Sequence, residues 1–557
     1  MKFRNILFVL ALAGLTSCED DFLDKVPMDS PSSATFFSTE TELNMAVNGA
    51  YRQLYWHSYK VPYQLWLDAS TDIAWCRGDF GSMLTAQGGQ YTTETPLFST
   101  VWAHMYEGIA RTNNILDNMD RAKDVVPAEK AQAVEAEAKF LRSYFYTYLI
   151  NLYGDVPWVD RMLSLEDAKL PKTPKKEILA NLYKDLDFAA AHLPAARPTA
   201  EKGKVTKGAA LTLKARVALL AGDFDVAASA ARAVMDLGLY KIDPSYSNLF
   251  QYKGAGSAEV IMEQQYHMDV FTTAIPRYLA HREPGGYSVL VPTQTLVDMY
   301  ACTDGKPIDE SPLFDPAKPF ENRDPRLDQS ILLPGEWVKG LQFQTHPDST
   351  KTYKRTDAGI RRVANPEVTN AYATFTGYIW NKYLDESDLP GNLAQSTLRM
   401  VMMRYAEVLL TYAEAKIELN QIDQSVIDAI NLVRCRQSVQ MPPAEQGMSQ
   451  PELRKLVRYE RTIELALEGF RLFDIRRWKY AEHVMPGNRL GRRKKAEWFS
   501  PVVPDIDEYG HPVYPDETKT FQVISVNQFN PGRDYLWPIP QSEINLNPNL
   551  TQNPGYN

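Results

Sequence analysis

The sequence predicts a mainly α protein, in which helical hairpins form a superhelical frame that a long, irregular, loop-rich insertion interrupts. Two observations lead to this fold class. In one stretch after another, apolar residues recur three and four positions apart, the spacing that places them on one face of a helix. Between about residues 245 and 395, in contrast, Pro, Gly, Asp and Tyr interrupt every long helical pattern.

Composition and charge limit the classes of function. The chain has 557 residues, of which 44% are hydrophobic and 23% are charged, so it can bury a sizeable core. Its formal net charge of -9 argues against a nucleic-acid partner, because a nucleic-acid binder would show a basic face. Its 4 cysteines are too few for a disulfide scaffold in a chain of this length.

The first expected element is a signal peptide over residues 1–17. Lys2 and Arg4 precede an apolar stretch over 6–15, which is shorter than the roughly 20 residues that span a bilayer. The stretch ends in LTSC (15–18), which resembles a bacterial lipobox, although an ordinary signal with an incidental cysteine is the alternative. The resemblance implies acylation of Cys18 and a lipid-anchored chain that does not cross the membrane. The acidic run after Cys18 resembles a Bacteroidetes surface-export signal, which implies a protein facing the cell exterior.

The helical frame is predicted in two parts, on either side of the insertion. The first helix is expected over 39–56, since Thr39 can cap it and glutamates follow in its first turn. The same periodicity predicts further helices over 101–119, 128–153, 175–192, 207–220, 225–237, 399–419, 423–437 and 450–468. We therefore expect an N-terminal helical part over 19–245, the insertion over 246–395 and a C-terminal helical part over 396–557.

Two of these stretches have the pattern of a helical hairpin. Residues 210–240 carry Gly222-Asp223 at the expected turn, and residues 404–434 carry Asn420-Gln421 there. Both resemble the tetratricopeptide helix-turn-helix repeat, although neither has the Trp-Leu-Gly start of that repeat.

Six blocks along the chain carry a more specific resemblance. They begin with CEDDFLDKVP (18–27) and end with LWPIPQSEINLNPNLTQNPGY (536–556), and the others lie at 102–119, 139–159, 398–420 and 460–480. Together they resemble the SusD/RagB family, surface lipoproteins of Bacteroidetes that capture nutrients. The resemblance implies a partly tetratricopeptide-like α fold with an irregular ligand-facing insertion. It also implies a partner, a TonB-dependent outer-membrane transporter (SusC-like), which the lipoprotein covers as a lid.

The sequence contains no established catalytic or metal-binding motif. HExxH, CxxC, GxSxG and the phosphate loop are all absent, and the 8 histidines are scattered. Residues 505–516 match part of a calcium loop, but Tyr509 and Asp516 depart from the pattern, which favours a solvated acidic turn. We expect no enzyme activity, no cofactor and no metal.

Residues that suit a sugar ligand occur in two regions outside the predicted helices. A sugar receptor needs an exposed flat ring for the C–H face, with polar side chains alongside for the hydroxyls. In residues 63–91 we expect Trp75 to be the stacking platform, Asp72 and Arg77 its polar neighbours, and Tyr91 a further contact, whereas Trp66 is assigned to the core. In the insertion the expected contacts are Tyr287, Arg361 and Arg362.

Other residues of these loops are assigned to structure. Trp380 and Tyr383 lie in a strand-like pattern and are expected in the core, as are the thiols of Cys302 and Cys435. The basic run GRRKKAEW (491–498) suggests a phosphate or lipid-surface patch by itself, but a solvated loop or a face toward the transporter is the preferred interpretation.

The leading hypothesis is a cell-surface glycan-binding lipoprotein that delivers oligosaccharides to the transporter without catalysis. Three alternatives stay open: a peptide-capturing member of the same family, a tetratricopeptide scaffold that binds only protein, and a hydrolase that uses unrecognised carboxylates.

Overall fold

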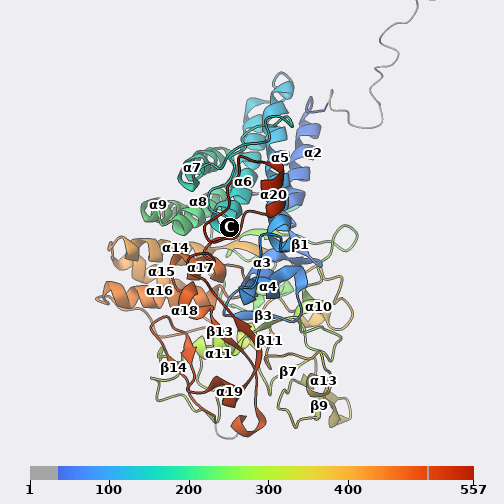
Figure 1. Cartoon of the computed structure of the whole chain (residues 1–557), viewed down its shortest axis with the longest axis vertical. Helices are drawn as coiled ribbons and strands as arrows, with labels where there is room; N and C mark the ends of the chain where they lie inside the picture. The colour runs from blue at the N-terminus through green and yellow to red at the C-terminus, as the bar shows by residue number, and fades with distance from the viewer. Residues whose placement is uncertain (1–35, 499–500, 557) are drawn as a thin grey trace, which may run out of the picture.

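The computed structural model describes residues 36–498 and 501–556. The predicted signal peptide and Cys18 lie outside the described residues. Figure 1 shows two groups of helices above a lower half in which short strands and loops dominate. The mainly α fold class with an irregular, loop-rich region is therefore confirmed. No helix in the described part of the chain is both long enough and apolar enough to span a bilayer.

The first helical group forms the upper part of the molecule. Thr39 begins its first helix with a capping box, because its side chain accepts from the Glu42 amide while the Glu42 side chain accepts from the Thr39 amide. From α5 onward each helix packs against the next in chain order, as expected of consecutive helical hairpins. The helices are α2 (Glu40–Tyr51), α5 (Pro96–Asn118), α6 (Ala128–Leu152), α7 (Lys175–His192), α8 (Lys207–Ala221) and α9 (Phe224–Asp236).

The second helical group packs against the first through α9 and α14. It comprises α14 (Tyr405–Glu418), α15 (Gln424–Arg434), α16 (Gln450–Glu464), α17 (Arg471–Arg477) and α18 (Ala481–Val484). The helix predicted over 399–419 begins only at Tyr405, so its first turn was predicted wrongly. Residues Met400–Arg404 instead form β12, which pairs antiparallel with β4 (Val260–Gln264) and is buried throughout. Pairing with a distant strand outweighs the local helical period here.

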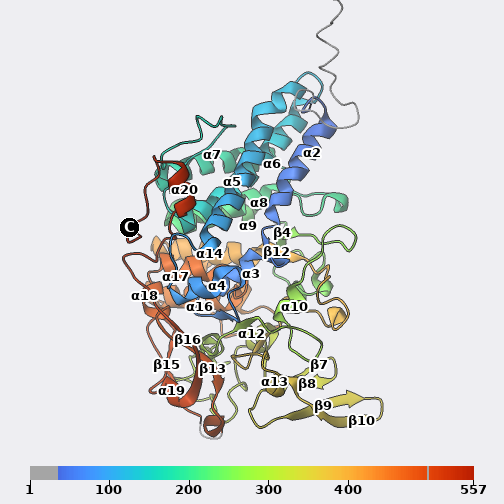
Figure 2. The same ribbon diagram turned by 45° about the vertical axis from the view of Figure 1, so that its right-hand side comes forward.

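The lower half consists of short strands that pair across long sequence separations. β3 (Ala74–Cys76) pairs with β5 (Leu290–Pro292) and thereby brings the loop 63–91 against the insertion. β13 (Gly487–Arg493) pairs with β16 (Phe521–Asn527). β9 (Lys351–Thr356) and β10 (Gly359–Ala364) form a hairpin that projects from the lower end in Figure 2.

The remaining strands are short pairs and ladders, namely β1 (His57–Ser58), β2 (Val61–Pro62), β6 (Ile331–Leu332), β7 (Trp337–Val338), β8 (Leu341–Gln342), β11 (Ile379–Trp380), β14 (Asp505–Ile506) and β15 (Pro512–Val513). Short helices lie between them, namely α3 (Tyr63–Asp68), α4 (Met83–Gly88), α10 (Ile275–Leu279), α11 (Gln294–Met299), α12 (Arg326–Ser330), α13 (Pro366–Thr369), α19 (Glu517–Thr520) and α20 (Gln541–Leu546).

A buried network of ion pairs joins the insertion to the second helical group. Glu464 on α16 contacts three arginines, at 3.1 Å (Arg326), 2.7 Å (Arg404) and 2.6 Å (Arg436). All four side chains are almost completely excluded from solvent. Burial alone would raise the pKa of Glu464, but the surrounding guanidinium groups hold it well below its usual range. The network therefore fixes the insertion against the helical frame.

The structure also tests the residues assigned to the core. Trp66, Trp380 and Tyr383 are fully buried, as predicted, and so is Cys302. The prediction for Cys435 is wrong, because this residue follows the last turn of α15 and is exposed. Of the cysteines that the structure describes, all are free thiols.

Candidate ligand-binding site

Trp75 is not an exposed stacking platform, so this prediction is wrong. The side chain is 4% exposed. Its ring packs against Phe375 with a centroid distance of 5.4 Å, and its indole N–H donates to Ser525 Oγ at 3.3 Å. The cause is the pairing of β3 with β5, which places residues 74–76 inside the molecule.

Asp72 and Tyr91 are also buried rather than available to a ligand. Both oxygens of Asp72 accept from Arg471, at 2.8 and 2.6 Å. Burial alone would raise the pKa of Asp72, but the Arg471 guanidinium outweighs this effect and lowers it. The Tyr91 hydroxyl donates to Asp534 at 2.9 Å. These two residues tie the loop 63–91 to the C-terminal part of the chain, and as ligand contacts they were predicted wrongly.

Arg77 and Tyr287, in contrast, lie together at the surface. The ladder between β3 and β5 continues by one bond, from the Arg77 amide to the Val289 carbonyl at 2.8 Å. Arg77 Nη2 then donates to the Tyr287 carbonyl at 2.9 Å. Thus two residues that were chosen from separate regions of the sequence meet at one place.

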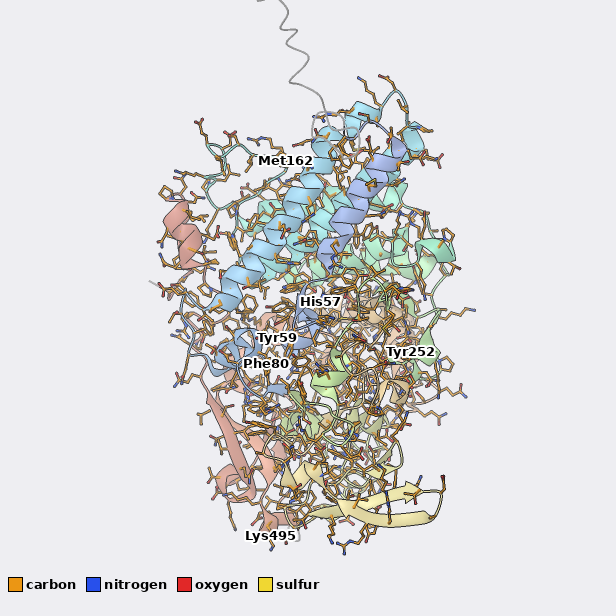
Figure 3. All side chains as sticks on the ribbon, turned by 90° about the vertical axis from the view of Figure 1, so that its right-hand side faces the viewer. His57, Tyr59, Phe80, Met162, Tyr252 and Lys495 are labelled. Carbon is orange, nitrogen blue, oxygen red and sulfur yellow. The ribbon has the colours of Figure 1, made fainter. Side chains whose placement is uncertain are left out.

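Further aromatic rings extend this surface. Tyr287 packs edge-on against Tyr278 at 5.8 Å, Tyr278 packs against Phe80 at 5.7 Å, and Phe80 packs against Tyr59 at 5.1 Å. Tyr59 is 57% exposed, Tyr372 is 59% exposed and Tyr287 is 38% exposed. Figure 3 shows Tyr59 and Phe80 side by side just below the first helical group.

Arginines lie against these rings. The Arg77 guanidinium is 4.9 Å from the ring centroid of Tyr372, and those of Arg277 and Arg282 are 5.4 and 5.8 Å from that of Tyr287. None of the three forms an ion pair within the described residues. We call this surface the aromatic–arginine patch; its members are Tyr59, Phe80, Tyr287, Tyr372, Arg77, Arg277 and Arg282.

Local turns place the patch residues at the surface. Tyr59 and Lys60 form the two-residue turn between β1 and β2, and both have positive φ, as a tight hairpin requires. Tyr287 follows Gly285-Gly286. A Cβ on Gly286 would lie 2.2 Å from the Ala280 carbonyl oxygen, so this close approach needs glycine.

The patch combines the two components of a sugar-binding surface. Its exposed rings can stack on the C–H face of a pyranose, and guanidinium groups can donate to hydroxyl oxygens. Burial lowers the pKa of Arg77, and the charge of Arg282 adds to this effect, yet a guanidinium stays protonated at neutral pH. The patch is therefore a cationic, donor-rich surface with aromatic faces.

Arg361 and Arg362 are exposed on β10, outside the patch. Their hairpin is nevertheless connected to the loop of Tyr287, because Lys354 on β9 pairs with Glu283 at 3.0 Å. Their contact with a ligand stays a prediction.

Among the described residues, no group of three or more His, Cys, Asp or Glu side chains could hold a metal. In the predicted acidic turn, Asp507 accepts from the Tyr509 and His511 amides and closes the β14–β15 hairpin.

Several patch residues were not chosen from the sequence. Phe80 lies in the loop that was singled out, and Tyr372 lies in the insertion, but neither has a motif of its own. Tyr59 lies between the first predicted helix and the loop that was singled out, and its place at a turn is known only from the pairing of β1 with β2. Arg277 and Arg282 flank a short buried segment and are identified only by their packing on Tyr287.

Comparison with known proteins identifies the family. A family model described as "SusD family" matches residues 255–556, which is more than half of the chain. The chain belongs to the SusD family. A second family model, described as "Starch-binding associating with outer membrane", matches residues 21–219 of this SusD-family protein. The family resemblance predicted from the six sequence blocks is thus confirmed.

Individual relatives agree with this assignment. The SusD-like protein P2 of Formosa agariphila is 26% identical over 100% of both chains. A SusD-like carbohydrate binding protein from Bacteroides fragilis has a crystal structure that is 31% identical, with a TM-score of 0.81 over 93% of this chain and 100% of that one. A laminarin binding SusD-like protein shares the fold at 19% identity, with a TM-score of 0.67 over 93% of this chain and 100% of the other.

Proposed function

We propose that this SusD-family protein binds oligosaccharides at the aromatic–arginine patch and passes them, chemically unchanged, to a TonB-dependent outer-membrane transporter. The observation that carries the proposal is the patch itself. Tyr59, Tyr287 and Tyr372 are exposed, and the arginines beside Tyr287 and Tyr372 form no ion pair with a carboxylate of the described residues. Exposed apolar groups that gather on one surface beside polar groups mark an interaction site, and aromatic rings beside arginines suit a sugar ligand.

Two further observations support the glycan ligand. The similar structure from Bacteroides fragilis is described as a carbohydrate binding protein, and another SusD-like structure as laminarin binding. The patch also lies where the loop 63–91 meets the insertion, the two regions in which the sequence predicts ligand contacts.

The cell-surface location rests on the lipobox-like sequence that ends at Cys18 and on the acidic run after it. Acylation of Cys18 would hold the protein on the outer membrane, facing outward. Surface labelling of cells tests this part directly. We expect Cys18→Ala to lose surface labelling, whereas unchanged labelling of that variant would contradict the anchor.

Calorimetric titration with neutral oligosaccharides tests the binding claim. We expect a saturable heat for at least one of a panel of glucans, mannans, fructans and xylans. Tyr287→Ala should weaken that binding about tenfold or more, because it removes a central stacking ring. Tyr353→Ala is the matched control, since Tyr353 is 46% exposed but lies on β9 outside the patch.

Two results would contradict the proposal. If the whole panel gives no heat while peptides bind, the protein captures peptides instead. If chromatography shows shortened oligosaccharides after incubation with the purified protein, the transfer is not free of catalysis.

A further inference from the structure

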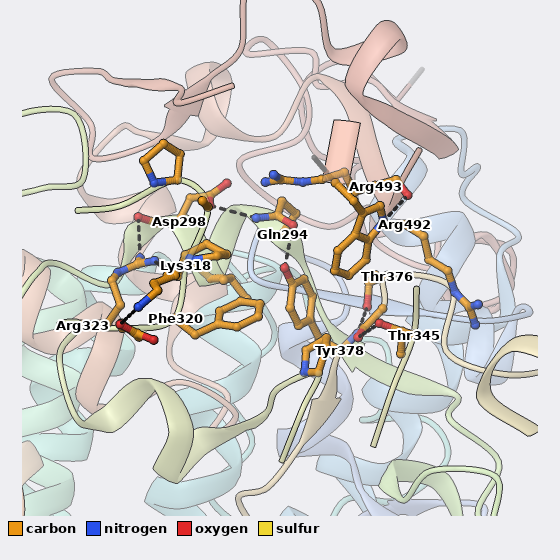
Figure 4. Close-up of a pocket in the computed structure, with 18 of the residues that line it drawn as sticks. Gln294, Asp298, Lys318, Phe320, Arg323, Thr345, Thr376, Tyr378, Arg492 and Arg493 are labelled. Carbon is orange, nitrogen blue, oxygen red and sulfur yellow. Dashed lines mark hydrogen bonds and ion pairs between the residues drawn. The ribbon is translucent and has the colours of Figure 1, made fainter. Parts of the chain in front are cut away.

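A separate cavity of about 290 Å³ lies in the lower half and shares no lining residue with the aromatic–arginine patch. It is bounded by α11, the turn segment 316–323, residues 376–378 and the end of β13 (Figure 4). Its volume lies near the lower end of the range for small-ligand pockets, which suits a single sugar ring.

Two arginines in this cavity have no carboxylate partner. Arg492 and Arg493 lie at the end of β13, and neither forms an ion pair with any described residue. Arg492 Nε donates to the Thr374 carbonyl at 2.7 Å. The Arg493 guanidinium lies 5.6 Å from the ring centroid of Phe521. Burial lowers the pKa of Arg492, and Glu367 offsets this only in part.

The other charged groups of the cavity already have partners. Lys318 pairs with Glu321 at 3.2 Å. Asp298 accepts from the Tyr514 hydroxyl at 2.6 Å and from Gln294 at 2.8 Å. Arg323 donates to backbone carbonyls, among them that of Tyr300 at 2.6 Å. Four cationic side chains therefore face two carboxylates, which leaves an excess of positive charge.

The rest of the lining resembles a sugar-binding surface more than a phosphate pocket. It includes the rings of Phe320, Tyr378 and Trp498, together with the amide and hydroxyl groups of Gln344 and Thr345. The Trp498 indole donates to the Arg493 carbonyl at 3.1 Å, so ring and arginine are held together. Figure 4 shows Tyr378 between Phe320 and Thr345, below Gln294.

The surroundings are cationic as well. The nearby β9–β10 hairpin carries Lys351, Lys354, Arg355, Arg361 and Arg362 against a single aspartate, Asp357. Lys495 is exposed at the same end of the molecule in Figure 3 and pairs with Asp348, just before β9. Such a field draws anions toward the cavity.

We infer that this cavity is a second glycan subsite, specific for a sugar unit that carries an anionic group, either a carboxylate or a sulfate. The planar fork of an arginine matches both groups, and the aromatic rings match the sugar ring. This inference rests on the proposed function, because it assigns a charged glycan to a protein that we propose to bind glycans. A neutral oligosaccharide would use the aromatic–arginine patch, and an acidic one would use both sites.

Titration with three oligosaccharides of equal length tests the inference, namely an oligouronate, a sulfated oligosaccharide and a neutral one. The full mature chain is compared with Arg492→Gln and Arg493→Gln. We expect each substitution to weaken binding of at least one anionic oligosaccharide about tenfold, since each removes a charge-assisted contact. Binding of the neutral oligosaccharide should not change. If only the oligouronate binds more weakly to the variants, the cavity recognises a carboxylate. If only the sulfated oligosaccharide does, it recognises a sulfate.

Arg161→Gln is the matched control, because Arg161 is an exposed arginine that pairs with Asp160 at 3.7 Å and does not line the cavity. It should alter anionic binding by less than about threefold. Equal anionic binding by all variants, or an equal loss in the control, would overturn the inference and leave the proposed function intact. If none of the three oligosaccharides binds, both the inference and the proposed function are overturned. Arg492 donates a hydrogen bond to the Thr374 carbonyl, so Arg492→Gln could fail to fold. In that case the test is made with Arg493→Gln alone.

Discussion

Arginines have opposite surroundings in two regions of this molecule. Between the insertion and the second helical group, Arg326, Arg404 and Arg436 are buried and each is bound by glutamates. In the aromatic–arginine patch, Arg77, Arg277 and Arg282 lie against tyrosine rings without a carboxylate partner among the described residues. Charge pairing therefore holds the frame together, whereas the unpaired guanidinium groups of the patch are the ones that we propose to contact a ligand.

The largest loss of stability is expected from a substitution in the buried ion-pair network around Glu464. Glu464→Gln removes the charge that three buried arginines share, so we expect the free energy of unfolding to fall by about 3–5 kcal/mol. Urea denaturation measures this loss. Glu107→Gln, which breaks the exposed pair with Arg111, should cost less than about 1 kcal/mol. If both variants lose the same amount, the buried network does not hold the insertion in place.

Removing one buried ring and one exposed ring distinguishes residues that stabilise the fold from residues that bind the ligand. Trp75→Ala should lower the free energy of unfolding by about 3–5 kcal/mol, since it leaves a cavity in the core. Tyr287→Ala should have a much smaller effect on stability but lower the affinity for oligosaccharide. Thermal denaturation and calorimetric titration of both variants are the measurements. If Trp75→Ala is as stable as the unmodified protein but no longer binds oligosaccharide, Trp75 is the stacking ring after all.

Acid should weaken the paired region. Burial alone would raise the pKa of Glu414, but Arg477 and Arg461 outweigh this and lower it to about 2. Arg436, Arg404 and Arg326 likewise hold the pKa of Glu464 well below its usual range. A carboxyl with a depressed folded-state pKa stabilises the fold above its unfolded pKa of about 4.3, and this stability is lost as the pH falls toward the folded value. Urea midpoints should therefore fall steadily from pH 5 to pH 3. A midpoint that does not change over this range would contradict the pairing.

Much of the frame could be predicted from the sequence. Because periodic apolar residues are a local signal, α7 begins and ends at the predicted residues and α6 ends within one residue of its predicted end. β12 was missed, because its partner β4 lies far away in the chain and local periodicity carries no information about such pairing.

The site was less predictable for the same reason. The sequence selected the two regions that the structure brings together, and within them it selected Arg77 and Tyr287, whose contact with a ligand stays a prediction. It could not show that Arg471 neutralises Asp72 from the far end of the chain, or that strand pairing buries Trp75. Residue type indicates which chemistry is possible, but exposure decides which ring can reach a sugar, and exposure depends on the tertiary structure.

A crystal structure of the protein with a bound oligosaccharide would show whether the aromatic–arginine patch binds sugar. The ligand is the neutral oligosaccharide that gives the strongest heat in the titration panel. We predict a sugar ring stacked on Tyr287 or Tyr59, with hydroxyl groups within hydrogen-bond distance of Arg77, Arg277 or Arg282. A sugar bound elsewhere, with the aromatic–arginine patch exposed to solvent and unoccupied, would contradict the account.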